Sequence, residues 1–378
     1  IDKLRPIEIE DLLGRDEVSS HYDKVTKDIE NATVLVSGAG GSIGSELCRV
    51  LSYLKPCKVV LFENSEPSLY AIYQELIGNN FNNINYIPLL GSVTNSRLVD
   101  KVIKENKVSI IFHAAAYKHV PLVEINPLQG LENNIISTRI LCESAFKNNI
   151  EKFVLISSDK AVRPTNLMGA SKRISELIVQ AYHDQISKLN QDSLIKPLFL
   201  MVRFGNVINS SGSVIPLFRN QIKKGGPITL THPNITRYFM TINEACQLVL
   251  QASSLAKGGD VFLLDMGKPV EIKKIAEQMI SLSGLTLKNE SNPNGDIEIR
   301  ITGLRSGEKL YEELLIENDS LSTEHPLIFK AKENFIDIKN LNKILNLLEE
   351  AISEQNLENS IKSVSTLVPE WESKIYKK

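Results

Sequence analysis

The stretch TVLVSGAGGSIG, residues 33–44, decides the fold of this 378-residue chain. Its first five residues have the apolar, β-branched character of a buried strand, and a glycine-rich turn follows directly. Gly38, Gly41 and Gly44 permit a tight turn, a close backbone approach to a pyrophosphate and close packing of the next helix on the strand. This order of strand, glycine loop and helix start is a strong signal for a dinucleotide site. We therefore place these residues at a cofactor site: Gly38, Gly40, Gly41, Ser42, Ile43 and Gly44.

Apolar strands and helical patterns alternate from residue 33 to residue 203. The expected strands are 33–37, 58–62, 84–90, 109–112, 152–157 and 198–203, and the clearest helices are 42–54, 65–77, 126–148 and 166–188. Such alternation predicts an α/β fold with a doubly wound parallel sheet, Rossmann-type, with helices on both faces. After Asn206 the pattern breaks into loops, with a helix at 242–256, a strand at 261–265 and a helix at 272–283.

This change of pattern predicts four regions. Residues 1–30 are a linker or an arm on the main body, and residues 31–206 form the cofactor-binding domain. Residues 207–334 form a smaller substrate lobe, of which one or two elements return to the main sheet. Residues 335–378 are expected to be no more than a surface helical tail.

The composition excludes several classes of protein. With 42% hydrophobic and 23% charged residues, the chain is typical of a well-cored globular protein. A net charge of −2 argues against a nucleic-acid-binding surface and leaves room for a local basic pocket. The cysteines lack the spacing of disulfides or of a metal site, which predicts reduced thiols in the cytoplasm and no metal; they are Cys48, Cys57, Cys142 and Cys246.

No run of residues approaches the roughly 18 apolar positions that a membrane-spanning helix needs. The start, IDKLRPIEIEDLLGRDEV, is too polar and acidic for a signal peptide and has no initiating methionine. We therefore expect a fragment of a longer protein, and no membrane contact by the fragment itself.

Glu63 ends the second expected strand, where a carboxylate accepts hydrogen bonds from an adenosine ribose and disfavours a 2′-phosphate. This position favours NAD over NADP, although a solvated acid would also suit the end of a strand.

The fourth strand is followed by small residues that let a flat cofactor lie on the backbone: Ala114, Ala115 and Ala116. Tyr117, Lys118 and His119 come next, and they either face a substrate or belong to an exposed loop. Asn134, in the helical stretch beyond, is expected to brace this edge of the sheet.

The fifth strand runs into SSDKAVRPTNLMGASK, residues 157–172. Ser158, Asp159 and Lys160 place a hydroxyl, a carboxyl and an amine at the carboxyl end of a strand, where open α/β sheets bind ligands. Met168 and Lys172 stand where a short-chain dehydrogenase carries Tyr-x-x-x-Lys. A thioether cannot ionise, so another group must take the proton that the tyrosine would take. From the residues alone, Asp159 and Lys160 are either an acid and a base or an ordinary ion pair.

The chain resembles the extended short-chain dehydrogenases/reductases, and among them the nucleotide-sugar 4,6-dehydratases of bacterial polysaccharide and glycan synthesis that act on UDP-N-acetylglucosamine. The matching segments are the 38–44 loop, AAAYKHVPLVE (114–124), residues 157–172, RFGNVINSSGSVIPLF (203–218), ITLTHPNITRYFMT (228–241) and GLRSGEKLYEEL (303–314). Members that retain configuration and are anchored in the membrane carry methionine at the position of Met168. The chain departs from the family at Ser158, commonly threonine, and at Ser306, commonly proline; neither change removes a needed group.

The resemblance implies a redox-neutral dehydration that uses NAD. Sugar carbon 4 is oxidised, water leaves across carbons 5 and 6, and hydride returns to carbon 6. Asp159 is the implied acid and Lys160 the implied base, because elimination needs both. The proton of the 4-hydroxyl passes to Ser158, to a water held by Asp159, or to Lys172, which also binds the nicotinamide ribose. The resemblance further implies a homodimer or higher homo-oligomer, on the cytoplasmic side of the bacterial inner membrane.

The nucleotide half of the UDP-sugar is assigned to Asn206, Ser213, Arg237, Arg305 and Glu308. Arginine suits a diphosphate because its planar fork gives paired, charge-assisted hydrogen bonds. Glu308 either pairs with one of the arginines or meets the uridine ribose. Two other functions remain open: a nucleotide-sugar 4-epimerase or reductase, and a non-catalytic NAD-binding protein.

Overall fold

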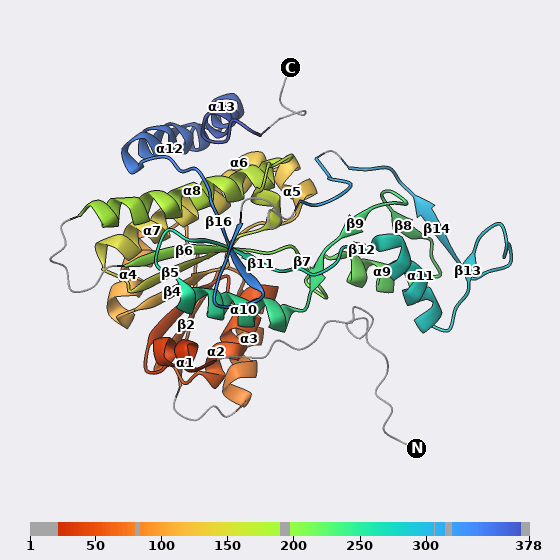
Figure 1. The fold of residues 1–378 in the computed structure, drawn as a ribbon, viewed down its shortest axis with the longest axis horizontal. Helices are drawn as coiled ribbons and strands as arrows, with labels where there is room; N and C mark the ends of the chain where they lie inside the picture. Colours follow the sequence, from red (N-terminus) through yellow and green to blue (C-terminus); the bar gives the residue numbers. More distant parts are fainter. Residues whose placement is uncertain (1–21, 80–83, 190–196, 306, 314–319, 372–378) are drawn as a thin grey trace. The chain divides into compact units, whose positions relative to one another are not determined.

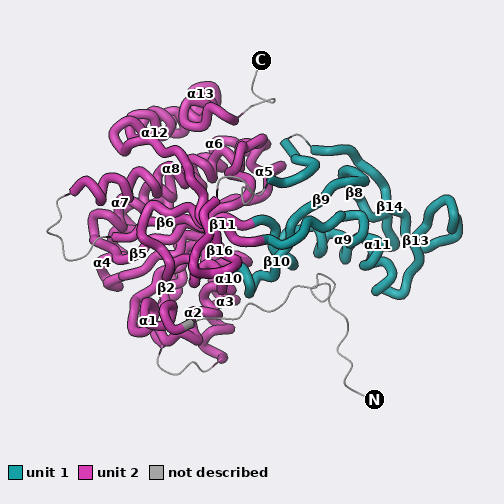
Figure 2. The backbone as a smooth tube through the Cα atoms, viewed as in Figure 1, with its two compact units in different colours: residues 1–19, 205–245, 266–313 teal, residues 20–204, 246–265, 314–378 magenta. Residues whose placement is uncertain are grey.

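The computed structural model describes residues 22–79, 84–189, 197–305, 307–313 and 320–371. Ser306 and the polar start of the chain lie outside these residues. The chain divides into two compact units (Figure 2). The smaller unit holds residues 1–19, 205–245 and 266–313, and the larger unit holds residues 20–204, 246–265 and 314–378.

The larger unit is built on a nine-stranded sheet in the order β15-β16-β11-β6-β5-β4-β1-β2-β3 (Figure 1). The strands are β1 Thr33–Ser37, β2 Lys58–Glu63, β3 Asn85–Leu90, β4 Ile110–His113, β5 Lys152–Ile156, β6 Leu198–Arg203, β11 Val261–Leu264, β15 Ser320–Ser322 and β16 Ile328–Ala331. β16 is antiparallel to both of its neighbours, β11 and β15, and all pairs from β11 to β3 are parallel. The strand order reverses between β1 and β4, the place where doubly wound sheets bind ligands. The predicted parallel sheet is confirmed, and the strand predicted at 261–265 returns to it as β11.

Helices cover both faces of this sheet (Figure 1). α2 Ser42–Tyr53, α3 Glu66–Gly78 and α10 Ile242–Leu255 lie on one face, and α4 Ser96–Asn106, α7 Ser137–Lys147 and α8 Leu167–Lys188 on the other. Shorter helical segments are α1 Tyr22–Ile29, α5 Val120–Ile125, α6 Pro127–Leu131, the π-helix η2 Glu132–Ile136 and the 3-10 turn η3 Asp159–Ala161. α1 belongs to the expected arm, and Asp28 ties it to Lys152 at the start of β5 through a 2.7 Å ion pair.

The helix expected over 126–148 runs without a gap from Pro127 to Lys147, and the π-turn at Glu132–Ile136 inserts one residue into its register. The carbonyl of Asn134 in this turn accepts hydrogen bonds from the hydroxyls of Thr138, at 2.7 Å, and Ser175, at 2.8 Å. These two hydroxyls satisfy the Asn134 carbonyl, which lies in the wider turn.

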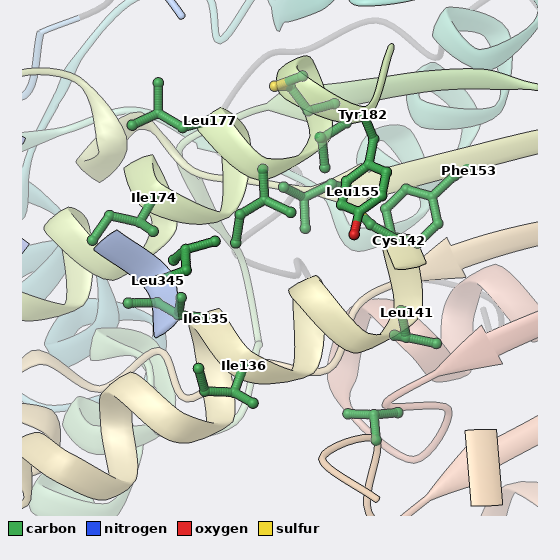
Figure 3. Packing of buried hydrophobic residues seen from close by; sticks show 14 of the residues in the cluster. Ile135, Ile136, Leu141, Cys142, Phe153, Leu155, Ile174, Leu177, Tyr182 and Leu345 are labelled. Atoms are coloured by element: carbon green, nitrogen blue, oxygen red, sulfur yellow. The ribbon is translucent and has the colours of Figure 1, made fainter. Parts of the chain in front are cut away.

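The tail forms two helices, α12 Ile338–Ser353 and α13 Leu357–Leu367, which pack against α8. Their inner faces are buried through Leu341, Leu345, Leu348, Val364 and Leu367. Leu345 joins the same hydrophobic cluster as Ile135 and Ile174 (Figure 3). The expectation of a mere surface helix is therefore wrong: each fully buried leucine contributes roughly 1.5–3 kcal/mol, and the Leu and Ile spacing marks a core-facing stripe.

The smaller unit packs two helices against short strands. The helices are α9 Val214–Lys223 and α11 Ile272–Leu282, and the strands are β7 Asn206–Val207, β8 Ile228–Leu230, β9 Thr236–Arg237, β10 Phe239–Met240, β12 Val270–Glu271, β13 Leu287–Lys288 and β14 Ile297–Ile301. Ile215, Phe218, Ile275 and Ile297 are buried in its core. No helix in the described part of the chain is both long enough and apolar enough to traverse a bilayer.

Candidate active site

The glycine loop joins β1 to α2 with almost no space to spare. Gly38 has a φ of +70°, and a Cβ there would lie 2.8 Å from the Cα of Ala115. A Cβ on Gly44 would lie 1.9 Å from the carbonyl oxygen of Gly38. Gly41 is the N-cap of α2 and provides no side-chain cap. The amino end of α2 therefore meets a bare backbone turn, as a pyrophosphate site requires.

Glu63, at the end of β2, is buried and holds this loop. Its Oε2 accepts a 2.9 Å hydrogen bond from the amide of Gly40, and its Oε1 accepts from the amides of Asn64 and Ser65. A carboxylate has about four acceptor positions, so three amide bonds leave capacity for a ribose hydroxyl. Glu63 thus orders the loop whichever ligand it meets.

The segment after β4 passes beside the glycine loop. The half-buried alanines 114–116 begin it, and the amide of Ala114 donates to the carbonyl of Ser37 at 3.1 Å. Asn134 fixes the next residue from both sides: its Oδ1 accepts from the amide of Tyr117 at 2.8 Å, and its Nδ2 donates to the carbonyl of Tyr117 at 3.0 Å. Nδ2 also donates to the hydroxyl of Ser171 on α8. Asn134 braces this edge of the sheet, as predicted.

Tyr117 and Lys118 are exposed and His119 is half-buried. Desolvation lowers the pKa of Lys118, and the charge of Lys160 lowers it further. Desolvation followed by the charge of Lys118 lowers the pKa of His119. The segment 117–119 therefore lies within electrostatic reach of the turn that carries Lys160.

That turn, η3, gathers three polar side chains where β5 ends. The hydroxyl of Ser158 donates to Oδ1 of Asp159 at 2.8 Å and accepts from the amide of Lys160 at 3.2 Å. Nζ of Lys160 lies 3.0 Å from the same Oδ1. The Asp159 side chain is 2% exposed and that of Lys160 23%, so the amine is the more accessible partner. The amide of Asp159 also donates to the carbonyl of Phe204, after β6.

Gly169 lets α8 approach this turn. A Cβ there would lie 2.2 Å from the carbonyl oxygen of Lys160, so any other residue would push the two apart. Asn166 caps α8 by accepting a hydrogen bond from the amide of Gly169 at 2.8 Å. Met168, in the first turn, is buried. The structure thus brings Met168 and the catalytic candidates 158–160 to one side of the sheet's carboxyl edge.

Lys172 lies one turn further along α8 and is buried. Its Nζ donates to the carbonyl of Ile156 at 2.6 Å. Burial lowers the pKa of Lys172 to about 8, and the carboxylate of Glu176 acts against this shift. His113 is kept neutral because burial, and then the charge of Lys172, lowers its pKa to about 3. Lys172 is therefore an amine that changes charge near physiological pH.

The residues expected at the nucleotide belong to the smaller unit. Arg237 donates to the carbonyls of Thr236 and Leu310, and Glu308 and Glu312 lie 3.4 and 3.6 Å from its guanidinium. Glu308 also accepts from the amide of Arg305, whose side chain is exposed.

Glu308 therefore pairs with an arginine, one of its two expected roles. Asn206 lies in β7, which pairs with β10. Ser213 is the N-cap of α9, and its hydroxyl is buried with no hydrogen-bond partner among the described residues.

Sequence reasoning missed Glu176. It follows Lys172 by four positions, a spacing that places both on one helix face. Its carboxylate accepts a 2.6 Å hydrogen bond from the hydroxyl of Ser157, next to the catalytic turn. A buried acid one turn from the family lysine was the available signal.

The family model described as polysaccharide biosynthesis protein matches residues 34–333. The chain belongs to this polysaccharide biosynthesis family. Within it, the capsular polysaccharide biosynthesis protein CapD of Staphylococcus aureus is 50% identical over 319 residues, 84% of this chain and 51% of CapD. The chain thus spans about half the length of CapD. The predicted resemblance is confirmed at the level of the polysaccharide biosynthesis family.

Two further matches extend beyond proteins named for polysaccharide synthesis. A UDP-glucose 4-epimerase of Rickettsia bellii (strain OSU 85-389) is 33% identical over 296 residues, 77% of this chain and 80% of the relative. The solved structure of Pen from Bacillus thuringiensis has a TM-score of 0.69 and 33% identity, and covers 84% of this chain and 99% of Pen. The chain is thus similar in sequence to a protein named as a UDP-glucose 4-epimerase, and similar in both sequence and fold to Pen.

Proposed function

We propose that the chain dehydrates UDP-N-acetylglucosamine to the UDP-4-keto-6-deoxy sugar, with NAD as cofactor and the configuration at carbon 5 retained. One observation carries the proposal: the Asp159 and Lys160 side chains lie 3.0 Å apart at the carboxyl end of β5. They belong to the turn that packs closely against α8 at Gly169. Loss of water needs an acid for the departing hydroxyl and a base for the proton on carbon 5, whereas epimerisation at carbon 4 eliminates no water and does not need this pair.

The residues of the glycine loop fit a dinucleotide. A Cβ on Gly41 would meet only the Gly38 carbonyl, at 3.2 Å, so the cap of α2 is open to a phosphate. Ser42, Ile43 and the half-buried alanines 114–116 would line the same path, and Glu63 would meet the adenosine ribose. When bound, NAD+ supplies a hydride acceptor for carbon 4 and returns the hydride to carbon 6.

Asp159 is proposed as the acid that protonates the departing hydroxyl, and Lys160 as the base that takes the proton from carbon 5. These roles require the proton that the two side chains share across 3.0 Å to lie on Asp159, so that Asp159 is a carboxylic acid and Lys160 a neutral amine when the sugar reacts. Ser158 fixes the carboxylate through its 2.8 Å hydrogen bond to Oδ1.

Lys172 is the favoured acceptor of the 4-hydroxyl proton. Burial brings its pKa to about 8, close to the value at which general bases work best near neutral pH. Met168 offers no ionisable group, and Ser158 already donates its proton to Asp159. Lys172 is also expected to bind the nicotinamide ribose.

The remaining assignments concern binding. Tyr117, Lys118 and His119 are proposed to face the sugar, and Arg237, Arg305, Glu308, Asn206 and Ser213 the uridine diphosphate. The described cysteines Cys48, Cys57, Cys142 and Cys246 are all free, which supports a cytoplasmic location for this activity.

Mass spectrometry of the purified protein with NAD+ and UDP-N-acetylglucosamine tests the proposal. We expect a product lighter by one water and no net NADH, and the Asp159→Asn variant should not form it. A product of unchanged mass, separable from the substrate, would replace the proposal by a 4-epimerase, the activity named for the Rickettsia relative. Bound cofactor with an unchanged substrate would indicate a non-catalytic protein.

A further inference from the structure

Four charged side chains form a buried ion cluster beneath the proposed active site: Arg173 and Glu176 on α8, Arg203 at the end of β6, and Glu333 just after β16. Arg203 donates two hydrogen bonds to Glu176, of 2.7 Å to Oε1 and 2.6 Å to Oε2. Arg173 lies 3.2 Å from Glu176 and 3.3 Å from Glu333. Glu333 also accepts a hydrogen bond from Arg203.

The cluster is balanced in charge and removed from water. The side chains of Glu176 and Arg203 are 0% and 2% exposed, Arg173 is 7% exposed and Glu333 17%. Two cations face two carboxylates, so removing either acid leaves an excess positive charge in a poorly solvated place. Burial acts to raise the pKa of Glu176, but Arg203 and Arg173 outweigh it, so the pKa is lowered and the carboxylate stays ionised.

Each proposed catalytic group has a short connection to this cluster. Ser157, which donates to Glu176, immediately precedes Ser158. Arg203 immediately precedes Phe204, whose carbonyl receives the amide of Asp159 at 3.1 Å. Glu176 is one helical turn from Lys172. Hydrogen bonds to Glu176 therefore connect the middle of α8 with the ends of β5 and β6.

We propose that Glu333 is a positioning residue of the active site, supplied by the C-terminal segment, which acts through Arg203 and Glu176 on the 157–160 turn and on Lys172. This inference rests on the proposed function for the identity of the reacting groups. It goes beyond that function by making the segment after β16 part of the catalytic machinery.

The expected consequence is electrostatic as well as geometric. Among the groups facing Lys172, His113 on β4 is neutral and Glu176 on α8 is the carboxylate that supports its charged form. Replacing Glu333 with glutamine removes a negative charge from the cluster, so the protonated form of Lys172 becomes less stable. The pH at which Lys172 titrates should fall.

The test compares Glu333→Gln with Glu349→Gln. Glu349 lies further along the C-terminal segment, on α12, and pairs with Arg139 on α7, so its loss also removes an ion pair of this segment but leaves the cluster intact. Both variants are first checked for folding by thermal unfolding. The pH dependence of kcat and of the NAD+ dissociation constant is then measured from pH 6 to 10 in the full chain.

We expect Glu333→Gln to move the pH inflection to lower pH and to reduce kcat by roughly ten- to a hundredfold, because small misplacements of reacting groups are costly. Glu333→Asp, which keeps the charge, should restore the inflection. Glu349→Gln should match the wild type in both measurements. Equal behaviour of Glu333→Gln and Glu349→Gln would overturn the inference.

The two proposals fail in different ways. Glu176→Gln and Arg203→Met are less suitable variants, because they open the cluster at its most buried point and threaten folding. If the wild type releases no water from the nucleotide sugar, the proposed function fails, yet a shifted NAD+ profile confined to Glu333→Gln still supports the positioning role. If the wild type is a dehydratase and its profile is unmoved by Glu333→Gln, the positioning role alone is rejected.

Discussion

The ammonium group of Lys172 donates a 2.6 Å hydrogen bond to the carbonyl of Ile156, the last residue of β5. This bond holds a buried amine at the end of the strand that leads into the catalytic turn. Burial lowers its pKa from 10.5 to about 8, so Lys172 loses its charge in a range where the protein can be assayed.

The first prediction concerns pH. Only the neutral amine can accept a proton, so turnover should rise as the pH passes through about 8, and Lys172→Met should lose this limb. The unfolded chain binds the proton up to 10.5 and the folded chain only to about 8. Stability should therefore rise between pH 8 and 10.5 in the wild type relative to Lys172→Met. Urea unfolding at these two pH values checks the sign, and a flat difference would contradict it.

The second prediction concerns the Asp159 and Lys160 pair. Asp159→Asn and Lys160→Met should each lower the rate of water loss by roughly 10²- to 10⁴-fold, since each removes a general acid or base. Mass-spectrometric rates measure this. Lys188→Met is the matched control, because Lys188 forms an exposed ion pair with Asp184 at the C-terminal end of α8. More than a tenth of the wild-type rate in Lys160→Met would remove Lys160 from its assigned role.

The third prediction concerns the glycine loop. Gly44→Ala places a methyl group 1.9 Å from the Gly38 carbonyl, a backbone atom that has no room to yield. We expect a loss of stability of about 1–3 kcal/mol or more and weaker NAD+ binding. Gly78→Ala is the control, because a Cβ there meets nothing within 4 Å. Calorimetry measures the melting temperatures of both variants. Equal melting temperatures would show that the loop has room for a methyl group at position 44.

The fourth prediction concerns Met168. If its thioether takes no part in proton transfer, Met168→Leu should keep most of the turnover and cost less than about 1.5 kcal/mol, because the two side chains have similar volumes. Turnover and thermal unfolding measured side by side provide the test. A large loss of rate in a stable Met168→Leu protein would give the sulfur atom a direct role.

Much of the sheet was predictable because its strands carry continuous apolar runs, which follow from burial on both faces. The predicted 33–37 and 198–203 strands have the bounds of β1 and β6. The helix predicted over 126–148 is helical from Pro127 to Lys147, but its π-turn was not predicted, since one extra residue leaves the apolar spacing almost unchanged. The Thr138 and Ser175 hydroxyls donate hydrogen bonds to the Asn134 carbonyl in this turn, and Ser175 comes from a distant part of the chain.

The candidate site likewise contains residues that the sequence indicated and residues that it did not. Local spacing indicated the Ser158, Asp159 and Lys160 turn, because these residues are adjacent. The buried partners of Arg203 could not be predicted, since Glu176 and Glu333 are brought to it by a helix and by an edge strand remote in sequence. Sequence patterns show which side chains are polar. Which of them are buried together depends on the tertiary fold, which brings remote segments into contact.

The chain alternates between the two compact units instead of completing one before starting the next, and α10 begins in one unit and ends in the other. A gene fragment encoding residues 205–313 would therefore carry β11 away with it and leave β6 paired with β5 alone. Neither unit can be exchanged by a single recombination event. New specificities in this architecture should thus arise by substitution inside each unit rather than by shuffling of whole modules.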